Sequence, residues 1–200
     1  MKKIVLFLFE GAELFEIASF TDIFGWNNIV GLKEFRDIEL EIISYKESVK
    51  CTWGGEIKVE KVITEENIEK FFNYDILVIP GGFGKANFFK EKNNEIFKKL
   101  IKYFSENNKI IVAICSAVIN LLESGYIKNK KVTTYLLDNK RYFNQLRNYN
   151  IIPIEEEIME DDNLLTCSGP GNALELSFRV LEKLTSKENV EIVKKNMFLK

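Results

Sequence analysis

The sequence predicts an α/β protein with a mostly parallel central sheet that is covered by helices. Short apolar, β-branched runs alternate with longer segments of helical period, which is typical of parallel strands joined by crossover helices. Most of the short runs carry apolar residues consecutively and do not alternate with polar ones, as expected for strands covered on both faces. These two observations indicate the fold class before any motif is considered.

Six segments are predicted as strands, and seven as helices. The strands are residues 4–9, 39–44, 76–79, 110–114, 132–134 and 164–167. The helices are residues 13–26, 65–72, 94–104, 116–124, 138–146, 172–184 and 188–196. The pattern is clearest in 94–104, where apolar residues recur at helical spacing. Between residues 47 and 62 polar and apolar residues alternate, which predicts a hairpin at the edge of the sheet.

Composition and charge favour one globular domain over residues 1–200 and disfavour several classes of partner. The chain is 46% hydrophobic and 29% charged, which is ordinary for a globular protein of 200 residues. Its net charge is −2. We therefore expect no general attraction to nucleic acid or to anionic membranes. The apolar run after the two N-terminal lysines stops at Glu10, so it predicts a strand and no signal peptide.

The cysteine count and the missing histidine limit the chemistry further. Three widely spaced cysteines, at 51, 115 and 167, suit a reducing cytoplasm better than a disulfide framework. The sequence contains no histidine, and it lacks the CxxC and HExxH spacings of metal sites. We therefore expect neither a metal nor a cofactor. Cys51 is expected to be a loop thiol and Cys167 a core residue at a strand end.

Cys115 stands where the predicted strand 110–114 ends and the predicted helix 116–124 begins. A thiol in the first turn of a helix faces free N–H groups and the positive end of the helix dipole, and both favour the thiolate. A pKa lowered to about 6 would leave roughly 90% of such a thiol ionised at pH 7. Many free cysteines are inert core residues, but this position favours a reactive one.

Glu16 is the predicted partner of Cys115. It falls in the first turn of the helix after the first strand, and its neighbours Leu14, Phe15 and Ile17 are apolar. Burial would raise the pKa of its carboxyl, and a nearby thiolate would raise it further, so that the pair shares one proton. This arrangement would supply a nucleophile and a general acid or base without imidazole.

Glycines after the predicted strand 76–79 are candidates for binding an oxyanion. The Gly82 N–H and the Ser116 N–H could both point at developing negative charge, although glycine pairs also serve simply as tight turns. Gly81, Phe83 and Tyr135 are candidate pocket residues on the same edge of the sheet.

Five segments, in this order and spacing, resemble the ThiJ/PfpI superfamily, also called DJ-one. They are residues 10–16 (EGAELFE), 74–82 (YDILVIPGG), 112–115 (VAIC), 131–134 (KVTT) and 166–171 (TCSGPG). The resemblance implies a flavodoxin-like three-layer α/β/α sandwich of the class I glutamine amidotransferase-like type, and a homodimer. It implies that Cys115 is a nucleophile at a strained elbow bonded to a protonated Glu16, and that Gly82 and Ser116 are backbone donors.

Three departures from the family pattern narrow the activity that the resemblance implies. Tyr135 occupies the place of the histidine that follows the Val-Thr-Thr motif in the deglycase branch. Ser116 stands where the peptidase branch has a histidine, so Cys-His peptidase chemistry is disfavoured. Ser168 replaces an arginine before the Gly-Pro-Gly motif, which removes a group that could bind an anion.

The leading functional hypothesis is a thiol-dependent enzyme of the glyoxalase III or deglycase type that acts on a small reactive aldehyde or a related electrophile. Cys115 would attack the aldehyde, Glu16 would move the proton, and Tyr135 would donate a hydrogen bond in place of the histidine. The rival hypothesis is a non-enzymatic oxidation sensor or chaperone-like protein whose Cys115 becomes a sulfinate. An isonitrile hydratase-like activity uses the same kind of site and stays open.

Overall fold

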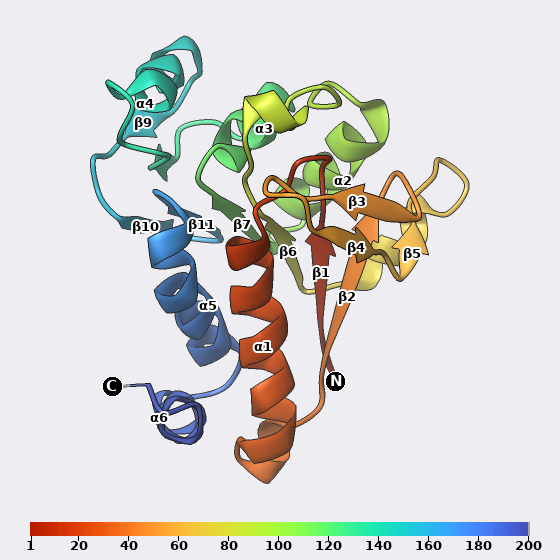
Figure 1. Cartoon of the computed structure of the whole chain (residues 1–200), viewed down its shortest axis with the longest axis vertical. Helices are drawn as coiled ribbons and strands as arrows, with labels where there is room; N and C mark the ends of the chain where they lie inside the picture. Colours follow the sequence, from red (N-terminus) through yellow and green to blue (C-terminus); the bar gives the residue numbers. More distant parts are fainter. Residues whose placement is uncertain (200) are drawn as a thin grey trace.

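A seven-stranded sheet forms the centre of the protein (Figure 1); the structure is a computed structural model that describes residues 1–199. The strand order is β10-β11-β7-β6-β1-β2-β5. The strands are β1 (Lys2–Phe7), β2 (Ile38–Ser44), β5 (Lys61–Val62), β6 (Ile76–Ile79), β7 (Ile110–Ile114), β10 (Ile158–Asp161) and β11 (Leu164–Cys167). Every neighbouring pair is parallel except β10 with β11. The prediction of a mostly parallel sheet is confirmed.

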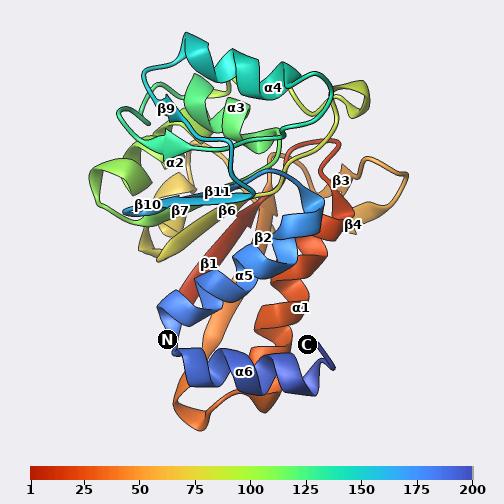
Figure 2. The ribbon, with the colours of Figure 1, turned by 90° about the vertical axis from the view of Figure 1, so that its left-hand side faces the viewer.

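Helices cover both faces of this sheet (Figure 2). One face carries α1 (Leu14–Val30), α5 (Pro170–Leu184) and α6 (Lys187–Asn196). The other carries α2 (Glu95–Glu106) and α3 (Ala117–Glu123), with the short α4 (Arg141–Gln145) above α3. None of the helices within residues 1–199 is long and apolar enough to cross a bilayer. The predicted flavodoxin-like sandwich is therefore the observed fold.

The consecutive apolar runs form two hydrophobic clusters, one on each face of the sheet. Strand β6 is buried along its whole length, and its alternate residues enter opposite clusters. On one face Phe97 of α2 packs against Phe7 and Phe9, with ring centroids 5.1 and 4.9 Å apart. Since both faces are sealed in this way, the polar chemistry of the protein is confined to the strand ends and loops.

Two predicted elements differ from the structure in the first half of the chain. Residues 65–72 do not form an α-helix; a 3-10 helix covers Ile68–Asn73. The Asn67 side chain accepts from the Thr64 N–H and donates to the Val62 carbonyl, which fixes a tight turn where the helix was expected to begin. The hairpin predicted within 47–62 exists as β3 (Ser48–Lys50) and β4 (Glu56–Lys58), but it forms its own small sheet.

The third difference lies beside Cys115. Residues 132–134 were expected to be a strand of the central sheet, whereas β8 (Lys131–Val132) pairs only with β9 (Ile152–Pro153) in a separate two-stranded sheet. The segment reaches the central sheet through side chains, because the Thr133 N–H donates to Thr166 Oγ1. The antiparallel edge strand β10, which was not predicted, takes the last place in the sheet.

The chain reverses its direction of winding at β1, which places a crevice at the carboxyl ends of the strands. From β1 it continues to β2 on one side, and it later returns to β6 on the other side. Such a switch point is where open α/β sheets bind ligands. Here the loop after β1 crosses the loop after β6, and Ala12 and Gly82 form an isolated antiparallel bridge.

Gly82 is required at this crossing, because a Cβ atom there would lie 2.1 Å from the Gly11 carbonyl oxygen. Gly82→Ala is expected to lower the free energy of unfolding by about 3 kcal/mol, since backbone must move to relieve the overlap. Gly25→Ala is the matched control: nothing lies within 4 Å of its added Cβ in α1, and the helix should gain roughly 0.5–1 kcal/mol. Urea denaturation measures both changes, and equal stabilities for the two variants would contradict the prediction.

Candidate active site

Four strand ends meet at one edge of the sheet and bring the predicted chemical residues together. Glu16 lies in the first turn of α1, after β1, and Gly81 follows β6. Cys115 comes directly after β7, and Cys167 is the last residue of β11. Since β1, β6, β7 and β11 are adjacent and parallel, these residues occupy neighbouring positions along the same edge.

Cys115 has the strained backbone that the resemblance implied. Its φ is +54°, in the left-handed region that side chains other than those of glycine, asparagine and aspartate rarely adopt. Two hydrogen bonds hold the residue in place: its N–H donates to the Cys167 carbonyl at 2.8 Å, and its own carbonyl accepts from Thr134 Oγ1 at 2.6 Å. The turn directs the thiol toward α1. Cys115 stays 8% exposed.

Glu16 is almost wholly buried beside that turn. Its Oε2 accepts a hydrogen bond from the Gly81 N–H at 2.5 Å, and its Oε1 has no hydrogen-bond partner among the described residues. Gly81 separates the carboxyl from the thiol: a Cβ there would lie 3.0 Å from Cys115 Cβ and 3.1 Å from Glu16 Oε2. Glu16 and Cys115 both approach Gly81, but the hydrogen bond between thiol and carboxyl that the resemblance implied is not found among the described residues.

Burial sets the protonation of Glu16. Desolvation raises the pKa of its carboxyl to about 8, the hydrogen bond from Gly81 opposes that rise, and the nearby Glu13 carboxylate adds to it. At neutral pH the carboxyl is consequently mostly protonated. A protonated carboxyl can act as a general acid.

The thiol of Cys115 behaves differently from the expectation based on its helix position. Burial raises its pKa well above the ordinary value and the Glu16 carboxylate raises it further, while the Ser116 N–H lowers it. The expected low pKa is therefore wrong for this state of the site. Helix α3 has only seven residues, and its dipole does not offset the desolvation of a buried thiolate. The Glu16–Cys115 pair therefore holds two protons at neutral pH and loses the first of them above neutral pH.

The two predicted backbone donors have different surroundings. The Ser116 N–H faces the sulfur of Cys115. The Gly82 N–H donates to Ser116 Oγ at 3.0 Å, and the same hydroxyl donates to the Gly82 carbonyl at 2.6 Å. In this structure the Ser116 hydroxyl accepts the hydrogen bond that the Gly82 N–H donates. Gly82 can therefore bind an oxyanion only after Ser116 Oγ turns away.

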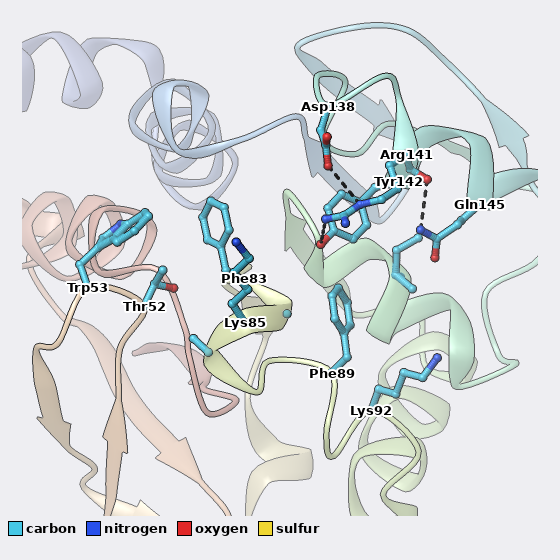
Figure 3. Close-up of a pocket in the computed structure, with 13 residues that line it drawn as sticks. Thr52, Trp53, Phe83, Lys85, Phe89, Lys92, Asp138, Arg141, Tyr142 and Gln145 are labelled. Atoms are coloured by element: carbon cyan, nitrogen blue, oxygen red, sulfur yellow. Dashed lines mark hydrogen bonds and ion pairs between the residues drawn. The ribbon is translucent and has the colours of Figure 1, made fainter.

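A cavity of about 1140 Å³ opens beside the loop after β6 (Figure 3), but neither Cys115 nor Glu16 lines it. Trp53 and Phe83 form one wall, with ring centroids 5.3 Å apart, and Arg141 and Tyr142 of α4 stand opposite. Lys85 is at its rim, and Arg141 is paired with Asp138 at 3.1 Å. Of the three candidate pocket residues only Phe83 lines this cavity.

Gly81 and Tyr135 lie outside the lining of this cavity. Gly81 lies beneath the carboxyl and the thiol, as described above. The Tyr135 ring packs against Tyr142, at 6.3 Å between centroids, and against Gly169, whose added Cβ would lie 3.6 Å from the ring. The aromatic ring therefore stands at the margin of the site.

Two residues of the site were not predicted as functional. Thr134 Oγ1 donates to the Cys115 carbonyl. This contact could not be predicted, because it depends on where the chain runs after β8. Cys167 was expected to be a core residue, and it is fully buried, but it also lies against Cys115 and Glu16. Cys51 is a buried loop thiol that follows β3. Residues 1–199 contain no group of three or more histidine, cysteine or acidic side chains placed to hold a metal ion.

The raised pKa of Glu16 makes protein stability depend on pH. The folded chain keeps a proton that the unfolded chain releases near pH 4.5, so the free energy of unfolding falls as pH rises from there to about 8. Glu16→Gln keeps an oxygen for the Gly81 N–H and removes this penalty. We expect the variant to gain stability over the wild type across this range, by up to about 5 kcal/mol at pH 8. Urea denaturation at pH 5 and pH 8 tests this, and a difference that does not change with pH would contradict it.

Known proteins match most of the length of this chain. The sequence model of the DJ-1/PfpI family matches residues 2–183. Protein dj-1beta of Drosophila melanogaster is 29% identical over 153 residues, which cover 76% of this chain and 77% of that protein. The glutathione-independent glyoxalase DJR-1.2 of Caenorhabditis elegans is 25% identical over 156 residues, or 78% of each chain.

The solved structures show the same fold over the full length. The crystal structure of Drosophila melanogaster DJ-1beta superposes with a TM-score of 0.82 at 25% identity, covering 100% of this chain and 98% of that one. Oxidized Toxoplasma gondii DJ-1 superposes with a TM-score of 0.79 at 20% identity, covering 100% and 99%. The match of the family model to residues 2–183 shows that the chain belongs to the DJ-1/PfpI family.

Proposed function

We propose that this protein converts small reactive aldehydes such as methylglyoxal to hydroxy acids, in the manner of a glyoxalase III, with Cys115 and Glu16 carrying the chemistry. The observation that carries the proposal is the buried Glu16 carboxyl, with one unpartnered oxygen, beside a thiol on a strained turn. The glyoxalase name of the Caenorhabditis elegans relative supports the same class of reaction.

The reaction begins with attack of the Cys115 sulfur on the aldehyde carbon. A carbon–sulfur bond forms, the carbonyl π bond opens, and the thiol proton passes to the new alkoxide, which gives a hemithioacetal. Glu16 then moves the proton from the hemithioacetal carbon to the neighbouring ketone carbon, while the hydroxyl proton passes to the ketone oxygen, which leaves a thioester of lactate. Water hydrolyses the thioester and restores the thiol, so the sum is methylglyoxal plus water to lactate.

Hydrogen-bond donors around the sulfur would stabilise the oxygen that gains charge. The Ser116 N–H is nearest to the sulfur. The Ser116 hydroxyl, which bridges to Gly82, can turn toward the substrate and release the Gly82 N–H to do the same. Tyr135 is placed at the margin and would contact the substrate's far end. In this proposal serine and backbone donors replace the missing imidazole.

The geometry favours small substrates over peptides. Cys115 is only 8% exposed, and Glu16 only 1%, which leaves no room for a peptide at the sulfur. Neither residue lines the cavity between Trp53 and Tyr142, although Phe83, which follows Gly82 directly, is part of its wall.

The test is conversion of methylglyoxal to lactate, measured by product formation over pH 6 to 9. We expect the wild-type rate to rise as the Glu16–Cys115 pair loses its first proton near pH 8. Cys115→Ala should reduce kcat/KM to the background level, and Glu16→Gln should reduce it at least a hundredfold. Cys51→Ser, which changes another buried thiol, is the matched control and should retain the wild-type rate. Equal background rates for the wild type and Cys115→Ala would refute the proposal.

A second candidate function is oxidation sensing without turnover. The sulfur of Cys115 is the one of the three that keeps both partial exposure and two adjacent donors, Glu16 and the Ser116 N–H, which stabilise an oxidised sulfur. Intact-mass spectrometry under mild peroxide tests it. We expect Cys115 to be the first residue oxidised and Cys115→Ser to remain unmodified; prior oxidation of Cys51 would contradict this function.

A further inference from the structure

A second thiol stands beside Cys115 at the carboxyl edge of the sheet. Strand β11 is parallel to β7, and its last residue, Cys167, is paired with Ile114, so that Cys167 and Cys115 are diagonal neighbours. Both belong to the hydrophobic cluster between the sheet and helices α1 and α5. The two side chains therefore emerge on the same face.

The backbone hydrogen bond limits the separation of these two residues. The Cys115 N–H donates to the Cys167 carbonyl, with 2.8 Å between the nitrogen and the oxygen. With standard bond lengths the two Cα atoms are then at most about 6.7 Å apart. Disulfides span Cα distances of about 4.4–6.8 Å, so the Cα separation of Cys115 and Cys167 lies below the upper limit for a disulfide.

Cys167, Cys115 and Glu16 also influence one another's ionisation. Burial and the Glu16 carboxylate raise the pKa of Cys167 to about 12, while hydrogen bonds with the backbone of Gly169 and Cys115 oppose this rise. Cys167 in turn contributes to the raised pKa of Cys115. Cys51 has other neighbours: its pKa is raised by burial and by Glu13 and Glu10.

We propose that Cys167 is a resolving thiol, which condenses with a sulfenic acid at Cys115 to form an intramolecular disulfide. A hydroperoxide first transfers one oxygen atom to the Cys115 sulfur, and the remainder of the hydroperoxide leaves as water or an alcohol. The Cys167 sulfur then attacks the Cys115 sulfur, an S–S bond forms and the S–O bond breaks. The Cys167 proton joins the departing hydroxide to give water, so no further oxidant is consumed.

The two thiols differ in access, and this difference assigns their roles. Cys167 has no exposed surface, so a peroxide in solvent cannot reach it before it reaches Cys115. The Glu16 carboxylate raises the pKa of both thiols, and the carboxyl can pass the Cys167 proton to the departing oxygen.

This inference rests on oxidation of Cys115, the second proposed function, and does not depend on turnover of aldehydes. It goes further because it assigns the fate of the oxidised sulfur. A sulfenic acid that is captured as a disulfide is protected from further oxygen transfer and can be restored by a thiol reductant, whereas a sulfinate cannot. Cys167 would thus make the oxidation of Cys115 reversible.

The experiment uses the full chain carrying Cys51→Ser, so that only the two thiols in question remain. After treatment with dilute hydrogen peroxide we expect a mass loss of about 2 Da, and a non-reducing digest that joins the Cys115 and Cys167 peptides. With Cys167→Ala added, Cys115 should instead gain about 32 Da, at least ten times faster than in the parent chain. Cys167→Ser gives a second test in which the buried volume is better preserved.

Two results would overturn the inference, and they are distinguishable. If Cys115 of the parent chain gains about 32 Da at the rate of the Cys167→Ala chain, then Cys115 is oxidised but Cys167 does not resolve it. If peroxide leaves Cys115 unmodified in both chains, the sensing function fails together with the resolving role. Methylglyoxal conversion by the same chains reports on the aldehyde activity independently.

Discussion

The hydrogen bond from the Gly81 N–H to Glu16 Oε2 is the contact on which the site depends. It ties the first turn of α1 to the end of β6 across the switch point of the sheet, and it fixes one oxygen of a buried carboxyl. The other oxygen has no hydrogen-bond partner among residues 1–199. A glycine is needed at position 81, since an added Cβ would lie 2.6 Å from the Ile114 carbonyl oxygen.

Burial, and not the helix terminus, governs the electrostatics of the site. Its three ionisable groups, Glu16, Cys115 and Cys167, lie near the same edge of the sheet. Desolvation is the largest influence on the pKa of each group. Removing them from water disfavours every charged form, so the resting site is neutral. Charge enters when a proton leaves the Glu16–Cys115 pair or when an electrophile or oxidant reaches the sulfur. The site is built to stabilise a single negative charge at a time.

The local sequence predicted much of this arrangement. Cys115 could be placed at a strand-to-helix turn because the apolar run 110–114 and the helical pattern after it leave no room for a loop. Glu16 could be recognised because apolar residues surround it in the first turn of a helix. The high pKa of the thiol could not be predicted, since it depends on what other elements pack over the turn.

The contacts that escaped prediction all depend on strand order, which periodicity does not contain. Cys167 lies beside Cys115 because β11 is the neighbour of β7 in the sheet, although more than forty residues separate them in the chain. Thr134 reaches the Cys115 carbonyl because β8 leaves the central sheet and pairs with β9. The short 3-10 helix at Ile68–Asn73 was missed for a local reason, the side-chain bonds of Asn67 that compete with a regular helix.

The left-handed backbone of Cys115 determines which residue would fit best at position 115. Most other non-glycine residues with positive φ within residues 1–199 are asparagine or aspartate, and the two exceptions besides Cys115, Lys140 and Phe198, are exposed. Cys115 alone among these three adopts this conformation in the interior, and the residue that would relieve it best is glycine, which has no sulfur. Substitution by glycine would therefore relieve the backbone strain at position 115 and remove the thiol at the same time.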